Sequence, residues 1–109
     1  QIITGGYNVY PAEVERVLTE HPDVAQACVY GIGDQRWGET VCAALVPRPG
    51  SGLTTDGVDA HCAERLAGYK RPRVVRFVEA LPLGSTNKVL RDEVRRMHLD
   101  DVVVEARPQ

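Results

Sequence analysis

Two apolar runs joined by a short polar connector constrain the fold of this chain more than any other feature. The runs are "VAQACVYGIGD" and "TVCAALVP", and "QRWGE" lies between them. Both are rich in β-branched and other apolar residues, which is typical of strands in a sheet core. We therefore expect two neighbouring strands that pair antiparallel.

The pattern on either side of this pair predicts three helices and one more strand. A β-prone stretch and a turn at Gly5 and Gly6 precede a helix that begins at Pro11 and ends at "HPD". A second helix, capped by Thr55 or Asp56, is expected to stop near Gly68. "RVVRFVEAL" predicts a third strand, and "KVLRDEVRRMHL" predicts a final helix. The residues expected to face the core from the three helices are Val14, Val17, Leu18, Val58, Cys62, Leu66, Val89, Leu90, Val94 and Met97.

The order β-α-β-β-α-β-α predicts an α+β fold. It should contain a small three-stranded, mostly antiparallel sheet covered by helices, preceded by a short N-terminal β turn. The tail, residues 98–109, is expected to add an edge strand or to fray. A chain of 109 residues fits one domain with one core. We expect it to need a partner domain for catalysis.

Charge and hydropathy narrow the functional classes. The net charge is −2, but the basic residues gather in the second half, most densely in "RLAGYKRPRVVR" at 65–76. This stretch suits phosphate contact or a solvated face. It lacks the aromatic platform of a nucleic-acid-binding fold, and no apolar run approaches the ~20 residues that span a bilayer. We expect neither a nucleic-acid partner nor a membrane span.

The cysteines and histidines predict no metal site. Cys28, Cys42 and Cys62 lack CxxC spacing, and the first two lie in apolar runs typical of a core. The three histidines are scattered without metal-ligand spacing. With no signal peptide visible, we expect a cytoplasmic protein. The chain starts without Met, so we expect it to be part of a longer protein.

Three short stretches carry candidate binding residues. Gly5 and Gly6 allow close approach of a ligand chain, and equally suit a tight turn. Trp37, the single tryptophan, stands in a polar connector, where an exposed indole could stack on a nucleobase or cover the sheet edge. "YKR" at 69–71 combines an aromatic ring with two cations and could take the ring and the phosphates of a nucleotide.

Lys88 is the candidate catalytic residue. A lysine at a helix start opposes the helix dipole at a cost of ~0.3–1 kcal/mol, and this unfavourable placement indicates a functional role. An ammonium group on a flexible stem suits a cluster of anionic oxygens, such as a carboxylate attacking an α-phosphate. A solvated surface charge is the alternative.

Four stretches fall in the order and spacing of one family. They are "IITGGYNVYPAEVE", "HPDVAQACVYGIGDQRWGETVCAALV", "LAGYKRPRVVRFVEALP" and "STNKVLRDEVRR". On these motifs the chain resembles, from Ile2 to Met97, the C-terminal domain of acyl-CoA synthetases in the adenylate-forming superfamily. "GGYNVYPAEVE" and "KVLR" look like fatty-acid and aryl or chlorobenzoate-type CoA ligases rather than peptide-synthetase adenylation domains. Luciferases are an alternative within the superfamily.

The resemblance implies a two-step reaction. A carboxylic acid and Mg-ATP give an acyl-adenylate and pyrophosphate, and CoA then displaces AMP. Residues 1–109 would be the mobile C-terminal domain. The hinge and the large N-terminal domain, with its ATP loop, Mg ligand and acyl pocket, would lie outside this chain. We therefore expect the isolated domain to be inactive.

The resemblance also implies roles for single residues. Lys88 would reach the carboxylate and the nucleotide in the first step. Gly5 and Gly6, followed by Tyr7, would line the pantetheine tunnel in the second. The positions that resemble CoA-nucleotide contacts are Trp37, Tyr69, Lys70 and Arg71.

One departure from the family pattern concerns the residue before this lysine. Most members have glycine where this chain has Asn87. Asparagine is the next-best residue for the left-handed backbone conformation, so we expect function to be kept. A domain of a different class, which binds CoA or a protein without catalysis, remains the alternative to the ligase.

Overall fold

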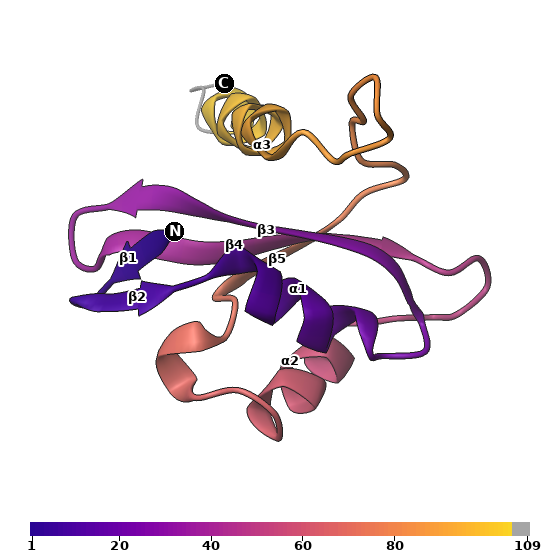
Figure 1. Cartoon of the computed structure of the whole chain (residues 1–109), viewed down its shortest axis with the longest axis horizontal. Helices are drawn as coiled ribbons and strands as arrows, with labels where there is room; N and C mark the ends of the chain where they lie inside the picture. Colours follow the sequence, from indigo (N-terminus) through magenta and orange to yellow (C-terminus); the bar gives the residue numbers. More distant parts are fainter. Residues whose placement is uncertain (106–109) are drawn as a thin grey trace.

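A long antiparallel hairpin forms the centre of the fold (Figure 1). The structure is a computed structural model that describes residues 1–105. Strand β3 (Val24–Asp34) pairs with β4 (Gly38–Pro47) along its whole length, with one irregularity between Val24 and Gln26. The antiparallel pair predicted from the two apolar runs is confirmed.

The sheet has five strands rather than the predicted three. The N-terminal β turn is a hairpin of β1 (Ile2–Thr4) and β2 (Tyr7–Val9), and β1 joins the start of β4 at Gly38. Strand β5 (Val74–Phe77) lies parallel to β4 on the same edge. The strand order is β2-β1-β4-β3, with β5 beside β4. Three-residue strands are too short to show an alternating pattern, so the sequence could not predict that this turn belongs to the sheet.

The helices are shorter at their beginnings or ends than predicted. Helix α1 covers Pro11–Thr19 and α2 covers Thr55–Ala63, followed by a single 3-10 turn, η1, at Gly68–Lys70. The cap of α2 is Thr54, whose hydroxyl accepts the N–H of Gly57, rather than Thr55 or Asp56. Helix α3 covers Arg91–Glu105 and therefore begins three residues after Lys88.

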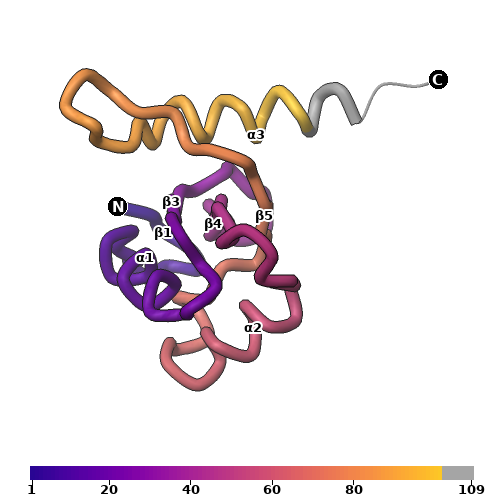
Figure 2. Tube along the Cα trace, turned by 90° about the vertical axis from the view of Figure 1, so that its right-hand side faces the viewer, coloured from indigo at the N-terminus to yellow at the C-terminus, as the bar shows by residue number. Residues whose placement is uncertain are grey.

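The helices cover both faces of the sheet, as the two views at right angles show (Figures 1 and 2). Alternate side chains of β4 point to opposite faces, and both faces are buried. The core toward α1 and α2 is formed by Ile2, Val9, Val14, Val17, Leu18, Val24, Val29, Val41, Ala43, Leu45, Val58, Cys62 and Leu66. The core toward α3 is formed by Cys28, Tyr30, Cys42, Ala44, Leu81 and Val94. The cysteines are core residues, as predicted.

Helix α3 packs on the sheet through a narrow stripe. Val94 and His98 are buried, whereas Leu90 and Met97, which were expected to face inward, are about two-fifths exposed. The Tyr30 hydroxyl lies 2.7 Å from His98 Nδ1 within this contact. The helix continues to Glu105, so the tail adds no edge strand up to that residue; residues 106–109 lie outside the described range. None of the helices described is both long and apolar enough to cross a bilayer.

Val94 and Met97 were both expected to face the core, but only Val94 is buried. Substituting each of them by alanine therefore tests the observed orientation of α3. Val94→Ala should lower the free energy of unfolding by about 2 kcal/mol, because it opens a cavity against the sheet. Met97→Ala, at an exposed position, should change it by less than about 0.5 kcal/mol. Urea unfolding of both variants measures this; equal losses would contradict the observed orientation of α3.

Candidate functional site

The turn at Gly5 and Gly6 requires glycine for geometry and lies directly on Trp37. Both glycines have positive φ, +55° and +84°, as a two-residue hairpin turn of this hand needs. The Gly5 N–H donates to the Trp37 carbonyl at 2.8 Å. A Cβ on Gly5 would stand 3.6 Å from the indole ring. The backbone of the turn therefore lies open next to an aromatic ring.

Asp34 fixes the connector that carries Trp37. One carboxylate oxygen accepts the backbone N–H groups of Arg36 (2.7 Å) and Trp37 (3.0 Å), and the other accepts the Thr40 hydroxyl at 2.9 Å. The N–H groups of Trp37 and Arg36 are the main reason why the pKa of Asp34 lies below its ordinary value. Asp34 thus fixes the backbone from which the Trp37 indole extends.

A small cleft lies between this connector, the N-terminal hairpin and η1. The Tyr7 and Tyr69 rings stack with centroids 4.5 Å apart. The Arg73 guanidinium lies 4.1 Å from the centroid of the Trp37 ring. We call this feature the aromatic cleft; its volume is about 110 Å³ and it is lined by Thr4, Gly5, Tyr7, Trp37, Tyr69 and Arg73.

The aromatic cleft corrects one expectation and adds one residue. Trp37 is half-buried rather than exposed, because Arg73 and Gly5 cover parts of its ring. Arg73 was not singled out as a site residue, although it belongs to the basic stretch 65–76. No separate signal in the sequence pointed to it, because alternation along an extended backbone would place Arg73 on the same side as Arg71, which does not line the aromatic cleft.

Lys70 and Arg71 are both engaged by neighbouring elements. Lys70 Nζ donates to Glu13 Oε2 at 3.0 Å, and this hydrogen bond raises the pKa of Lys70. The same ammonium lies 5.7 Å from the centroid of the Tyr69 ring. Arg71 donates to the carbonyls of Leu66 and Ala63 and does not line the aromatic cleft. Its role toward a nucleotide stays a prediction.

Lys88 stands on a separate hairpin, which we call the lysine hairpin, at residues 83–89. Leu83 pairs with Val89, and the Gly84 N–H donates to the Lys88 carbonyl at 2.8 Å. Asn87 has φ +61°, the left-handed conformation expected from the sequence. The Lys88 side chain is exposed, and residues 88–93 line a hollow of about 510 Å³ beside it.

The helix-dipole argument for Lys88 is wrong. Helix α3 begins at Arg91, and its first backbone bond runs from the Val94 N–H to the Leu90 carbonyl. Lys88 therefore precedes the helix. It is not destabilised by the helix dipole, whose effect is confined to the terminal turn. Its exposed ammonium has no hydrogen bond or ion pair within residues 1–105.

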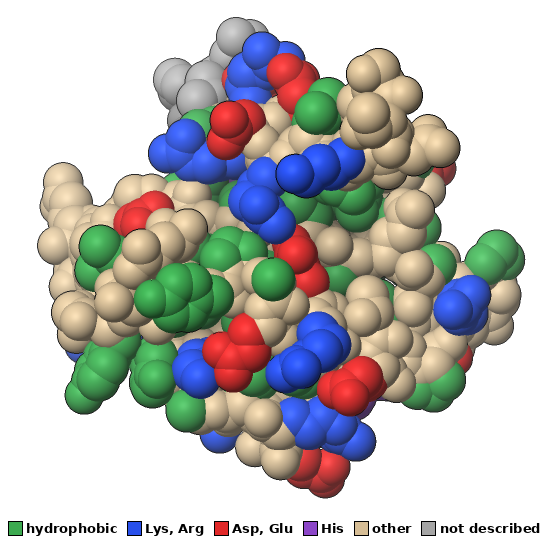
Figure 3. Space-filling view, in the orientation of Figure 1, with side chains coloured by type: hydrophobic (Ala, Val, Ile, Leu, Met, Phe, Trp, Pro, Cys, Tyr) green, Lys and Arg blue, Asp and Glu red, His purple; other side chains and the backbone are tan. Residues whose placement is uncertain are grey.

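The two candidate sites lie at opposite ends of the domain. In Figure 1 the turn between β1 and β2 is at the left, and the lysine hairpin is the orange loop at the upper right. The face seen in Figure 3 carries basic and acidic side chains side by side, without a large patch of one sign. The sites are thus local constellations rather than parts of one charged surface.

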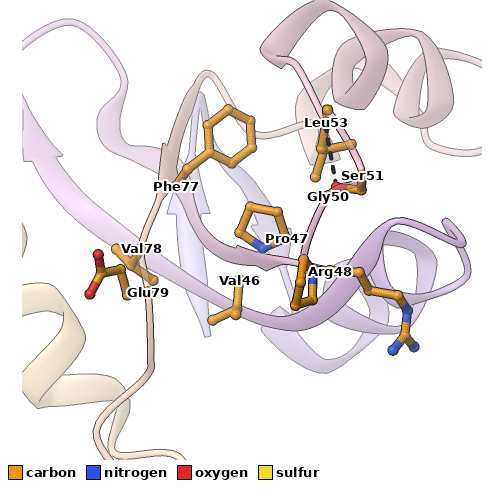
Figure 4. A pocket seen from close by; sticks show the side chains of 11 residues that line it. Val46, Pro47, Arg48, Gly50, Ser51, Leu53, Phe77, Val78 and Glu79 are labelled. Atoms are coloured by element: carbon orange, nitrogen blue, oxygen red, sulfur yellow. Dashed lines mark hydrogen bonds between the residues drawn. The ribbon is translucent and has the colours of Figure 1, made fainter.

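Other features of the described residues offer no comparable chemistry. A hollow of about 520 Å³ is lined mainly by apolar side chains such as Val46, Pro47 and Phe77, and the Arg48 side chain points away from it (Figure 4). Burial raises the pKa of Cys28 and Cys42 to about 11, so both thiols are protonated at neutral pH. No group of three or more His, Cys, Asp or Glu residues in the described part of the chain is placed to hold a metal ion.

Comparison with known proteins gives one consistent result. The family described as AMP-binding enzyme C-terminal domain matches residues 13–88. The chain is 50% identical over 95 residues to a methyl-dioxo-octahydroindenyl-propanoyl:CoA ligase of Mycobacterium tuberculosis, covering 87% of this chain and 19% of the relative. It is 46% identical over 94 residues to 4-chlorobenzoate CoA ligase of a Pseudomonas species, covering 85% and 18%.

A solved structure with a bound ligand is also similar. A double mutant of o-succinylbenzoate CoA synthetase from Bacillus subtilis, bound with the product analogue OSB-NCoA, superposes with a TM-score of 0.82 at 43% identity. The match covers 87% of this chain and 19% of that one. The chain spans about a fifth of the length of the relatives it matches.

Acid should release the Trp37 connector through Asp34. Because hydrogen bonds lower the pKa of Asp34 below 3.8 in the folded chain, their contribution is complete above that pH and is lost as the pH falls through the lowered pKa. Fluorescence of the single tryptophan should stay constant from about pH 7 to about pH 4 and change below. In Asp34→Asn this acid step should vanish; if it persists, another carboxylate controls the connector.

The left-handed conformation of Asn87 predicts a simple order of stabilities. Asn87→Gly should leave the free energy of unfolding within about 0.5 kcal/mol, because glycine adopts positive φ without strain. Asn87→Val should lower it by about 1–2 kcal/mol, because a β-branched residue clashes there. Thermal unfolding compares the two variants; a stable Val variant would show that the hairpin does not need this conformation.

Proposed function

Because the chain belongs to the AMP-binding enzyme C-terminal domain family, we propose that it is the C-terminal domain of an ATP-dependent acyl-CoA ligase. The ligase joins a carboxylic acid to CoA in two steps, with AMP and pyrophosphate as the other products. Its large N-terminal domain, which completes both centres, is the domain's main partner. The observation that carries this proposal is the presence of two separate candidate sites at opposite ends of one small domain.

Lys88 serves the first step. A carboxylate oxygen attacks the α-phosphorus of ATP, and the bond to the pyrophosphate oxygen breaks. The anionic carboxylate must approach anionic phosphate oxygens, and its negative charge passes to the phosphate and the leaving pyrophosphate, so an ammonium held among these oxygens lowers the barrier without exchanging a proton. Lys88 suits this role because its ammonium is exposed and unpaired within the described residues, while its backbone is fixed by the hairpin.

The aromatic cleft serves the second step. The CoA sulfur, as thiolate, attacks the acyl carbonyl of the adenylate, and AMP leaves as its phosphate oxygen departs with the electron pair. The open backbone at Gly5 and Gly6 lines the path of the pantetheine chain, and Tyr7 and Tyr69 flank it. Trp37 offers its ring to the adenine, for which Arg73 must leave the indole face. Arg73 and Lys70 then lie near the CoA phosphates.

The two sites require two orientations of the domain. Sites at opposite ends cannot both face one reaction centre of the large domain at once. The domain would therefore turn between the steps and present the lysine hairpin first and the aromatic cleft second. ATP would enter as its Mg²⁺ complex, with the metal's protein ligands outside this chain. A cytoplasmic location, compatible with three buried free cysteines, stays a prediction.

A non-catalytic domain that binds CoA on its own is the competing proposal. The isolated chain contains the aromatic cleft, so calorimetry with CoA tests it directly. Binding tighter than about 1 mM would favour the competing proposal, because a site completed by a second domain should bind weakly alone.

Two variants of the ligase that carries this domain separate the two steps. Lys88→Ala should slow adenylate formation by about 100-fold or more, measured as pyrophosphate release, because the charge clamp is lost. It should change thioester formation from supplied acyl-adenylate by less than about threefold. Trp37→Ala should raise the KM for CoA and leave the KM for ATP unchanged.

Arg16→Ala is the matched control, because Arg16 is an exposed cation on α1 outside both sites. It should alter neither half-reaction. Equal losses in both half-reactions for Lys88→Ala would overturn the assignment of Lys88 to the first step.

A further inference from the structure

Helix α1 carries two glutamates that reach in different directions toward the two candidate sites. Glu13 and Glu15 are two residues apart, which places them about 200° apart around a helix. We propose that both are positioning residues, Glu15 for the lysine hairpin and Glu13 for the aromatic cleft. This inference rests on the proposed function, because it assigns each glutamate to one half-reaction of the ligase.

Glu15 and Arg91 together bind the free edge of β3. The Val29 N–H donates to Glu15 Oε2 at 2.8 Å, and Arg91 Nε donates to the Val29 carbonyl at 2.9 Å. Arg91 Nη2 also donates to both carboxylate oxygens of Glu15, at 3.0 Å to Oε2 and 3.2 Å to Oε1. Both polar groups of one strand residue are thereby satisfied by an ion pair. The Glu15 side chain is only 20% exposed, so the pair is partly shielded from solvent.

Arg91 is the first residue of α3 and directly follows the lysine hairpin. The Leu90 N–H donates to the Pro82 carbonyl at 2.9 Å, which fixes the base of the hairpin, and Leu83 pairs with Val89 just above it. Lys88 is therefore three residues from an arginine that is fastened to the sheet. Without this ion pair, the hairpin would keep its own hydrogen bonds but lose one of its attachments to β3.

Glu13 fixes the other site through Lys70. The 3.0 Å ion pair joins α1 to η1, and the Lys70 ammonium lies over the Tyr69 ring. Tyr69 in turn stacks on Tyr7, next to the turn of the N-terminal hairpin. Glu13 thus helps to hold η1, none of whose residues is buried, against the cleft.

Neither glutamate lines the aromatic cleft or the hollow beside Lys88. Their effect on the reaction must therefore pass through Arg91 and Lys70. A displacement of about 1 Å at a reacting group can cost about 100-fold in rate, so loss of a distant fastening can be measured in catalysis.

The test uses Glu15→Gln and Glu13→Gln in the ligase that carries this domain, because glutamine keeps the shape and an acceptor oxygen but removes the charge. Adenylate formation is followed by pyrophosphate release, and thioester formation by adding CoA to supplied acyl-adenylate. Glu15→Gln should lower the kcat of adenylation about 10-fold or more, with a much smaller loss in thioester formation. Glu13→Gln should raise the KM for CoA about 3- to 10-fold, with little change in the kcat of thioester formation.

Additional variants separate positioning from general destabilisation. Arg91→Gln should reproduce the selective adenylation loss of Glu15→Gln. Glu13→Asp, which keeps a negative charge facing Lys70, should raise the KM for CoA less than Glu13→Gln does. Glu20→Gln, an exposed residue at the end of α1, should change neither half-reaction. Melting temperatures of all variants show whether a loss of rate or a rise in KM is explained by lower stability of the domain.

Two results would overturn the inference. One is an equal loss of both half-reactions in each glutamate variant, which would indicate general destabilisation. The other is a parent-like rate and KM in both. Lys88→Ala, measured alongside, separates this failure from that of the proposed function: if Lys88→Ala also spares adenylation, the ligase assignment of Lys88 itself fails.

Discussion

The pairing of β3 with β4 is the constraint on which the rest of the structure depends. Val41 to Leu45 of β4 are buried on both faces, so each successive side chain belongs to a different core. A slip of one residue in the register would exchange the two sets and place Val41 and Leu45 under α3. The same pairing sets both ends of the hairpin, one of which carries Trp37. The connector that carries Trp37 and the Val29 groups that Glu15 and Arg91 bind therefore depend on one register.

Much of the fold could be predicted because the strongest signals in the sequence are long. The central hairpin is marked by two long apolar runs, and α1 by an apolar face that repeats over nine residues; both are as expected. The errors fall where the signal is short or local. Strands β1 and β2 have three residues each, and the start of α3 is delayed because Leu83 pairs with Val89, a contact that local propensity does not describe.

The sequence predicted which residues belong to the candidate sites better than it predicted the contacts that those residues make. Gly5, Gly6 and Asn87 have the positive φ expected of them, because backbone conformation is a local property of residue type. The half-burial of Trp37 and the place of Arg73 depend on three segments far apart in the chain. The engagement of Arg71 with the end of α2 likewise follows from where that helix stops. Contacts between segments far apart in the chain produce no periodic pattern in the sequence, so they could not be predicted from it.

The protection of the β3 edge has a consequence beyond catalysis. An outer strand with unpaired N–H and C=O groups invites a strand from another molecule to add to it. Here Glu15, Arg91 and Arg95 occupy those groups at Val29 and Gly31 with charged side chains. A strand from a second molecule would have to displace these three charges before it could pair. The contacts that hold the lysine hairpin in place thereby also disfavour addition of a foreign strand at this stretch of the β3 edge.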